Sequence, residues 1–326
     1  MTTPAHAASQ PAEGAEGPKS PVGGGAPAHR PSMVSGIARI ARPHQWIKNL
    51  LVFVAPGAAG VLLHGDVFVH ALEAFGVFCV AASGSYFLND AIDVEADRRH
   101  PTKSSRPVAS GVVPVGLAVA IGVVLLAGSL VLAAVVAGRD LTVVMSVYAA
   151  VNICYSLGLK REPILDLAAV SSGFVLRAIA GGVATRVPLT DWFVIVAAFG
   201  SLLIVTGKRS GEQRLLTDAE TAHHEVRATL GAYTPSFLQT VRTLSAAVTV
   251  TAYCLWAFDR AAHAHPGHDP IWFQLTIVPF VLGLLHVVRD LDAGHGHTPE
   301  DLAIHDHRLQ LYGLVWVAMF AAGIYG

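Results

Sequence analysis

Long apolar segments recur along this 326-residue chain from Gln45 onward, and polar stretches separate them. Each segment is close to the roughly 20 residues that an α-helix needs to cross a bilayer. Backbone groups inside lipid must be satisfied within the protein, which favours helices over open strands. We therefore expect an all-α, polytopic membrane bundle of nine transmembrane helices at residues 45–63, 69–89, 113–137, 141–158, 164–184, 190–206, 236–258, 271–290 and 309–325.

The first 35 residues follow a different pattern. They are rich in Pro, Gly, Ala and Ser and contain few large apolar side chains. Such a segment cannot bury enough apolar surface to offset the entropy lost on ordering. The pattern predicts a disordered cytosolic tail at residues 1–35 and one nine-helix transmembrane catalytic domain at residues 36–326.

Composition supports a membrane protein. Charged residues make up 14% of the chain and hydrophobic residues 53%, whereas a soluble domain has about 25% charged residues. This argues against a nucleic-acid binder and a typical cytosolic enzyme. The net charge of −1 provides no overall field to attract an anionic partner. The three cysteines lie in apolar segments and predict no disulfide framework.

The basic residues predict the orientation of the bundle. With a cytosolic tail, the tail and the loops on its side carry fifteen of the 22 Lys and Arg residues, and the opposite loops carry three. Positive residues concentrate on the cytoplasmic side of membrane proteins. We therefore expect a multi-pass plasma-membrane protein whose active site and charged loops face the cytosol.

A regular row of oxygen-bearing side chains ends the second apolar segment. Asn89, Asp93 and Asp97 are spaced by four, so a helix would place them on one face, with Asp90 beside them. Such oxygen ligands suit Mg²⁺, which commonly bridges to substrate phosphates. Basic residues that suit phosphate follow at Arg98, Arg99, Lys103 and Arg106. The row predicts a magnesium–diphosphate site with Asn89 and Asp93 as metal ligands; the alternative is a solvated loop that only sets topology.

Two ionisable residues lie within or at the edge of the fifth apolar segment, and such residues are candidates for a functional site. Asp166 and Arg177 are separated by about three helical turns and about 16 Å of rise, which places them on one face but too far apart for contact. Each therefore needs another partner. Lys48 by itself is typical of an interfacial lysine beside Trp46.

Two further loops are basic, and both also fit an ordinary solvated loop. One contains Lys160; the other contains Lys208, Arg209 and Glu212 after a flexible glycine. The 16 histidines include two loop clusters, which we attribute to loop composition rather than to a metal site: His263, His265 and His268, and His295, His297, His305 and His307.

The string "NDAIDVEAD" (Asn89–Asp97) resembles the NDxxDxxxD motif of the UbiA superfamily of intramembrane prenyltransferases. The resemblance extends over residues 36–326 and implies nine helices around a central cavity, with a magnesium–diphosphate held at cytosolic loops. Three further strings resemble the branch that transfers a phosphoribosyl group: "RPHQWIKNLLVFVAP", "HPTKSSRPVASG" and "FVLRAIAGG". Near the sixth helix, where prenyl diphosphate users carry a second Asp-rich motif, this chain has the basic "GKRSGEQ".

The resemblance implies phosphoribosyl pyrophosphate as donor, a polyprenyl (decaprenyl) phosphate lipid as acceptor, Mg²⁺ as cofactor, and a product used for arabinan in the cell wall. The acceptor phosphate is already ionised, so we expect no catalytic base.

The alternatives are an aromatic prenyltransferase of the same fold and a transporter. The oligomeric state is left open, a homo-oligomer included. The expected catalytic residues are Asp93, Asp97 and Asp90, and the expected substrate contacts are Lys48, Tyr86, Lys103, Arg106, Lys160, Asp166, Arg177, Lys208, Arg209 and Glu212.

Overall fold

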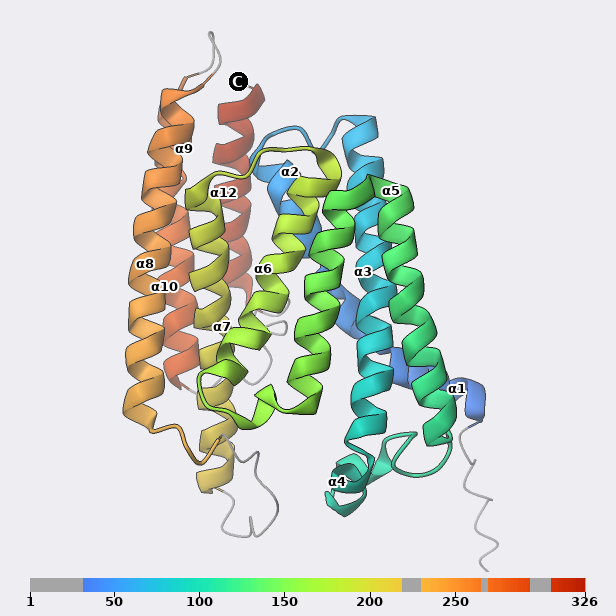
Figure 1. Ribbon diagram of the computed structural model, residues 1–326. Helices are drawn as coiled ribbons and strands as arrows, with labels where there is room; N and C mark the ends of the chain where they lie inside the picture. The colour runs from blue at the N-terminus through green and yellow to red at the C-terminus, as the bar shows by residue number, and fades with distance from the viewer. Residues whose placement is uncertain (1–31, 219–229, 265–268, 294–305, 326) are drawn as a thin grey trace, which may run out of the picture. The chain divides into compact units, whose positions relative to one another are not determined.

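The computed structural model describes residues 32–218, 230–264, 269–293 and 306–325 (Figure 1). All the regular elements in these ranges are helices, which confirms the predicted all-α class. Residues 1–31 of the predicted tail lie outside the described residues. Ser32 caps the first helix by accepting a hydrogen bond from the Ser35 amide at 3.2 Å, so residues 33–35 belong to that helix.

The described ranges contain both α-helices and 3₁₀ helices. In chain order they are α1 (Met33–Ala41), η1 (Pro43–Phe53), α2 (Val54–Ala58), α3 (Gly65–Ile92), α4 (Val94–Arg99), η2 (Lys103–Ser105), α5 (Val115–Leu157), η3 (Leu159–Arg161), α6 (Leu165–Thr185), α7 (Asp191–Asp218), α8 (Pro235–Ala262), α9 (Ile271–Leu275), α10 (Ile277–Ala293) and α12 (His307–Tyr325), where η marks a 3₁₀ helix.

Seven helical segments in the described ranges are long and apolar enough to cross a membrane. One of them, α5, has 43 residues and contains a break at Ala137 and Gly138, whose backbone angles are not helical. Gly138 has a φ of 67°, a conformation that glycine adopts at little cost. The chain reverses direction there, and the two arms of α5 run antiparallel (Figure 1). This break separates the predicted segments 113–137 and 141–158.

The first predicted membrane segment, residues 45–63, is wrong as a regular α-helix. The chain forms the 3₁₀ helix η1 and then the short helix α2. Pro56 has no N–H to donate to the carbonyl of Val52, so regular α-helical bonding is interrupted at this point. A Cβ on Gly181 would lie 1.9 Å from the Val52 carbonyl oxygen, so η1 and α6 touch through their backbones. This contact brings η1 into the centre of the helix bundle.

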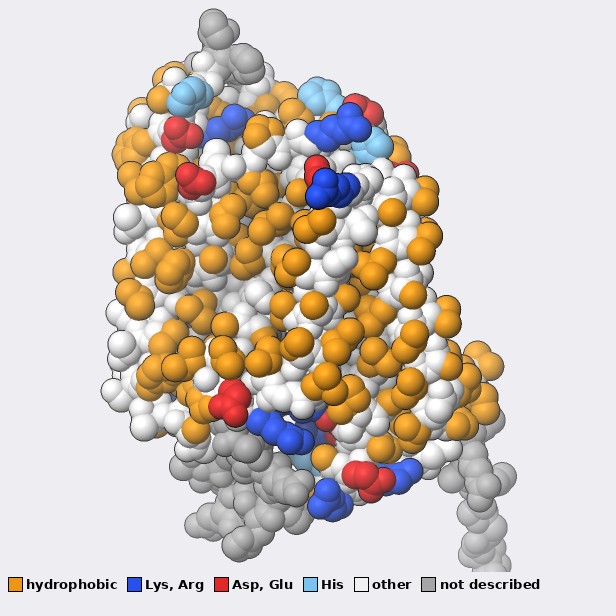
Figure 2. Space-filling model, in the orientation of Figure 1, with side chains coloured by type: hydrophobic (Ala, Val, Ile, Leu, Met, Phe, Trp, Pro, Cys, Tyr) orange, Lys and Arg blue, Asp and Glu red, His pale blue; other side chains and the backbone are white. Residues whose placement is uncertain are grey.

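Buried side chains of α3, α5 and α6 form one hydrophobic core around Phe78, Leu141 and Met145. Large apolar residues also cover the outside: Leu63 and Val135 are both more than three-quarters exposed. Figure 2 shows hydrophobic side chains over the middle of one face and charged side chains gathered at its two ends. An apolar exterior between charged ends suits a bilayer, since lipid tails accept apolar side chains that water would not.

Candidate active site

The predicted Asn89–Asp93–Asp97 row crosses a bend between two helices. Helix α3 ends at Ile92, α4 begins at Val94, and Asp93 lies between them with φ −85° and ψ 2°. The Asp93 amide still donates to the Asn89 carbonyl at 2.9 Å, and the Asp97 amide to the Asp93 carbonyl at 2.8 Å. The prediction of one uninterrupted helical row is therefore wrong, because the bend at Asp93 changes the direction in which Asp97 projects.

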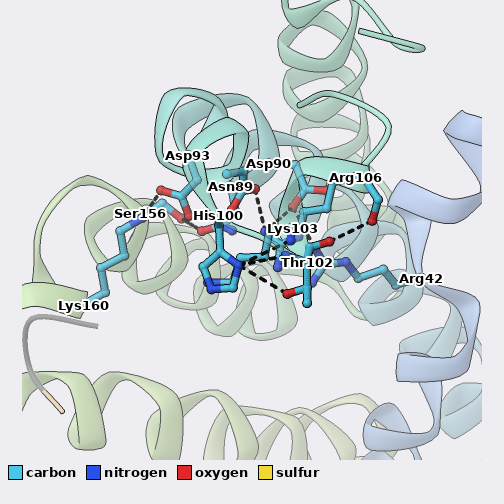
Figure 3. Close-up of polar contacts among 12 residues, drawn as sticks. Arg42, Asn89, Asp90, Asp93, His100, Thr102, Lys103, Arg106, Ser156 and Lys160 are labelled. Atoms are coloured by element: carbon cyan, nitrogen blue, oxygen red, sulfur yellow. Dashed lines mark hydrogen bonds and ion pairs between the residues drawn. The ribbon is translucent and has the colours of Figure 1, made fainter. Parts of the chain in front are cut away.

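Asn89 and Asp93 face the C-terminal end of α5 and the following helix η3. The Ser156 hydroxyl donates to the side-chain oxygen of Asn89 at 3.2 Å, and Lys160 forms an ion pair with the Asp93 carboxylate. Figure 3 shows these four side chains grouped together. Neither Asn89 nor Asp93 is fully buried. An amide oxygen and a partly exposed carboxylate, side by side, are a donor set that fits Mg²⁺.

Asp90 and Asp97 are buried and have different partners. Asp90 pairs with Arg42 at 2.7 Å and with Arg106 at 3.5 Å, and Arg106 also pairs with Asp97 at 2.7 Å. The Arg42 guanidinium lies over the Tyr86 ring, 4.9 Å from its centre. Buried carboxylates of this kind need such cations, because an unpaired buried charge is costly. These ion pairs join α3 and α4 to the chain before η1 and to the loop after η2.

A second cluster of charges joins the start of α6 to the end of α7. Asp166, which is fully buried, accepts two hydrogen bonds from Arg209, at 2.7 and 2.9 Å. It also accepts one from the Tyr155 hydroxyl at 3.0 Å. Arg209 reaches Glu212 at 2.9 Å. The structure thus supplies the separate partner that the spacing of Asp166 and Arg177 required, and it brings together three predicted site residues.

Arg177 lies inside the bundle, where its nitrogen atoms bind protein groups. The guanidinium donates to the Asn49 side chain at 2.7 Å, to the Gly173 carbonyl at 2.6 Å and to the Tyr148 hydroxyl at 3.1 Å. It also lies against the rings of Tyr148 and Phe78. Through these contacts Arg177 joins η1, α5 and α6 in the interior, and its predicted phosphate contact stays a prediction.

The remaining predicted contacts are distributed over several elements. Lys48 is partly buried on η1, and Lys208 precedes Arg209 on α7. Lys103 lies on η2, where its amide donates to His100 Nδ1 at 3.4 Å, in the same close-up as Arg106 (Figure 3). Each of these three lysines has interactions with other groups in the protein.

A histidine that sequence reasoning did not select forms a cluster with two carboxylates. His286 Nε2 lies 2.6 Å from Asp306 and 3.4 Å from Asp290, and Arg289 also pairs with Asp290. The hydrogen bond with His286 holds the pKa of Asp306 well below its usual range. Of the predicted histidine clusters, only His263 and His307 belong to the described part of the chain.

A cavity of about 720 Å³ lies between α2, α7, α8, α10 and α12. Its walls are apolar and aromatic, with Phe193, Trp256, Phe280 and Trp316 among the lining residues. The Tyr253 hydroxyl also faces this region, where it donates to Thr276 at 2.7 Å. The cavity has the chemistry to accept a hydrocarbon chain and offers few groups to a charged ligand.

Taken together, the apolar bundle and the ion pairs at the helix ends define an integral membrane protein with a cluster of charged residues at its helix ends. The model of the UbiA prenyltransferase family matches residues 50–314, and the chain belongs to this family.

Relatives and solved structures agree with this assignment. Decaprenyl-phosphate phosphoribosyltransferase from Mycolicibacterium smegmatis is 45% identical over 90% of this chain and 94% of its own length. The protein of the same name from Mycobacterium tuberculosis is 44% identical over 90% of this chain and 95% of its own. The structure of a UbiA homolog from Archaeoglobus fulgidus bound to GPP and Mg²⁺ has a TM-score of 0.65 and 18% identity, covering 89% of this chain and 98% of that chain.

Proposed function

We propose that this protein transfers the 5-phosphoribosyl group of phosphoribosyl pyrophosphate to a polyprenyl phosphate such as decaprenyl phosphate, with release of pyrophosphate. The main support is the 42–45% identity, over 90% of the chain, to relatives named decaprenyl-phosphate phosphoribosyltransferase. The product is a phosphoribosylated lipid that serves as an arabinan precursor for the cell wall.

Asn89 and Asp93 are proposed to hold Mg²⁺, because their oxygen atoms lie together and are not fully buried. When bound, Mg²⁺ supplies charge neutralisation for the departing diphosphate, which is worth several kcal/mol in phosphoryl chemistry. Lys160, which pairs with Asp93 in the structure, is positioned to exchange this carboxylate for a phosphate of the donor. Lys103 and Arg106 provide further positive charge beside the same turn.

Asp90 and Asp97 are proposed to act by holding cations rather than by touching the reacting atoms. Their ion pairs fix the guanidinium of Arg106, whose planar donor groups suit bidentate contact with phosphate oxygens. Asp166 holds the guanidinium of Arg209 in the same way. With Lys208 and Glu212, Arg209 closes the donor pocket, and Lys48 and Tyr86 remain proposed substrate contacts.

The reaction needs no protein base. The bond from ribose C1 to the diphosphate oxygen breaks, and its electron pair leaves with pyrophosphate. An oxygen of the lipid phosphate forms the new bond to C1 from the opposite face. This oxygen is ionised near neutral pH, so no proton has to be removed. The protein contributes orientation of two anions and stabilisation of the leaving charge.

The apolar cavity between α2, α7, α8, α10 and α12 is proposed to hold the polyprenyl chain. Each buried CH₂ contributes about 0.8 kcal/mol, so an apolar wall favours a long hydrocarbon chain without any specific polar contact. The lipid phosphate would then lie at the end of the bundle that carries Asn89 and Asp93, beside the donor.

The proposed topology has nine membrane crossings. The seven helical segments become eight when α5 is divided at its break, and η1 with α2 provides the ninth. The distribution of Lys and Arg supports a cytosolic N-terminus and a cytosolic active site in the plasma membrane. The tail is proposed to end before Ser32, which caps α1, and the catalytic domain is proposed to follow from there to residue 326.

A second candidate is prenyl transfer to an aromatic acceptor, which the UbiA homolog bound to GPP and Mg²⁺ suggests for the same fold. The basic sequence at Gly207–Gln213 argues against it, since this stretch offers one carboxylate, Glu212, and that carboxylate already pairs with Arg209. A second metal site of acidic residues is therefore not available at this position.

One experiment separates these two functions. The purified protein is supplied with Mg²⁺, labelled phosphoribosyl pyrophosphate and a polyprenyl phosphate. We expect label to enter the organic-soluble lipid only when Mg²⁺ is present. Absence of this transfer, in a preparation that moves a prenyl group from a prenyl diphosphate to an aromatic acceptor, would establish the second candidate instead.

A further inference from the structure

The turn before α6 has a rare backbone conformation. Ile164 has φ 70° and ψ −50°, and the Leu165 amide donates to the Pro163 carbonyl at 2.8 Å, which together form a γ-turn. A β-branched residue at positive φ is strained. Isoleucine also has no side-chain oxygen to cap a helix, although Ile164 occupies the N-cap position of α6. Another part of the protein must therefore stabilise this turn.

Tyr233 supplies that stabilisation from the segment before α8. Its hydroxyl accepts a hydrogen bond from the Ile164 amide at 3.0 Å. The Tyr233 carbonyl accepts another from the Gln213 side chain of α7 at 2.6 Å, and its ring stacks on Phe237 of α8. The side chain is buried, and this burial raises the pKa of Tyr233, so the hydroxyl is neutral. One residue thus contacts the start of α6 and the ends of two other helices.

The turn determines where Asp166 points. Asp166 follows Ile164 by two residues, and its amide donates to the Glu162 carbonyl at 3.0 Å, so its backbone position depends on the turn. Its carboxylate receives both hydrogen bonds from Arg209. A relaxed turn would shift the first residues of α6 and weaken this two-point contact, because paired donors tolerate little change in angle.

We propose that Tyr233 is a positioning residue for the donor site: its hydroxyl holds the strained γ-turn at Ile164 and so keeps Asp166 aligned with Arg209. The link to the donor rests on the proposed function. The strain lowers the population of this turn conformation by a factor on the order of ten to a hundred. The Tyr233 hydrogen bond offsets that loss.

The test combines removal of the Tyr233 hydroxyl with a substitution that relieves the backbone strain at Ile164. Tyr233→Phe removes only the acceptor oxygen. Ile164→Gly removes the strain, since glycine adopts positive φ readily, whereas Ile164→Val keeps it. We expect Tyr233→Phe to raise the KM for phosphoribosyl pyrophosphate roughly five- to thirtyfold, with kcat within about threefold. Adding Ile164→Gly should restore KM to within about twofold, and adding Ile164→Val should not. Tyr325→Phe, at the exposed end of α12, is the matched control.

A wild-type KM in Tyr233→Phe, or a rescue that is equal for Gly and Val, would overturn the proposal. A purely structural role for Tyr233 predicts lower stability without rescue by glycine. Amide hydrogen exchange of peptides spanning residues 162–168 tests the turn without any activity: exchange should be faster in Tyr233→Phe and unchanged elsewhere in α6. If the wild-type protein transfers no label, the proposed function fails, and the exchange result still decides whether Tyr233 holds the turn.

Discussion

The turn between α3 and α4 carries two pairs of oxygen-bearing side chains that differ in burial and in their partners. Asn89 and Asp93 are partly exposed and contact Ser156 and Lys160 at the end of α5. Asp90 and Asp97 are buried and pair with arginines. The two pairs alternate within nine residues of sequence. Their difference shows that the chemistry of such a motif depends on the helix bend and on the partners of each side chain.

The two pairs suit different roles, metal binding and structural support. A carboxylate that binds a metal must be reachable and must be able to exchange its cation. A buried carboxylate held by an arginine loses more by exchange, because the arginine would be left without its counter-charge. We therefore propose the metal at the Asn89–Asp93 pair and the support of the site by the Asp90–Asp97 pair.

The largest effect is expected at Asp93. Asp93→Ala should lower the transfer rate by about a thousandfold or more, because a charged metal ligand worth several kcal/mol is lost. The melting temperature should change little, since Asp93 and Lys160 are both partly exposed. Transfer of labelled phosphoribosyl and thermal melting in detergent measure the two quantities. Full activity in this variant would remove Asp93 from the metal site.

Asp90→Ala should instead act mainly on stability. The substitution removes the partner of Arg42 and one partner of Arg106, and breaking a buried ion pair costs about 3 kcal/mol. A lower melting temperature and poorer recovery of folded protein are the expected results. Glu95→Ala is the control: Glu95 pairs with Arg98 on the surface, and such pairs contribute about 1 kcal/mol or less. Equal melting temperatures for the two variants would contradict the assignment of Asp90.

A smaller effect is expected at Lys160. Lys160→Met should raise the KM for phosphoribosyl pyrophosphate by about tenfold, as expected when one charge-assisted phosphate contact is lost. Arg161→Met changes the exposed neighbour on η3 and should leave KM within about twofold. Initial rates over a range of donor concentrations give both values. A similar rise in both variants would mean that the general positive charge of the loop, rather than Lys160, attracts the donor.

Much of the fold could be predicted from hydrophobic length alone. Segments near 20 residues identified the long apolar helices from α3 onward, and the polar gap near Gly138 coincides with the break in α5. The first segment could not be predicted in the same way. The chain there forms the 3₁₀ helix η1, and Val52 of η1 packs closely on Gly181, which lies far away in the sequence.

Contacts between residues far apart in the sequence also limited the prediction of the candidate site. Spacing correctly indicated that Asp166 needs a remote partner, but Arg209 follows it by 43 residues and local patterns cannot pair them. Arg177 was selected for its charge, but its partner Asn49 lies 128 residues away, so local patterns cannot predict this contact. Tyr233 was missed because its neighbours give no signal of the turn at Ile164. Positions in the motif are visible in sequence, whereas the partners that set their roles are not.

The dependence of transfer on Mg²⁺ concentration, measured side by side in Asn89→Ala and Asp90→Asn, tests the central claim most directly. Asn89→Ala should raise the Mg²⁺ concentration for half-maximal transfer by about tenfold or more, as loss of a metal ligand or its support does. Asp90→Asn should leave that concentration within about twofold of the wild-type value while lowering the melting temperature. The reverse pattern, with the Mg²⁺ requirement raised by Asp90→Asn and unchanged by Asn89→Ala, would contradict the division of the turn into a metal pair and a supporting pair.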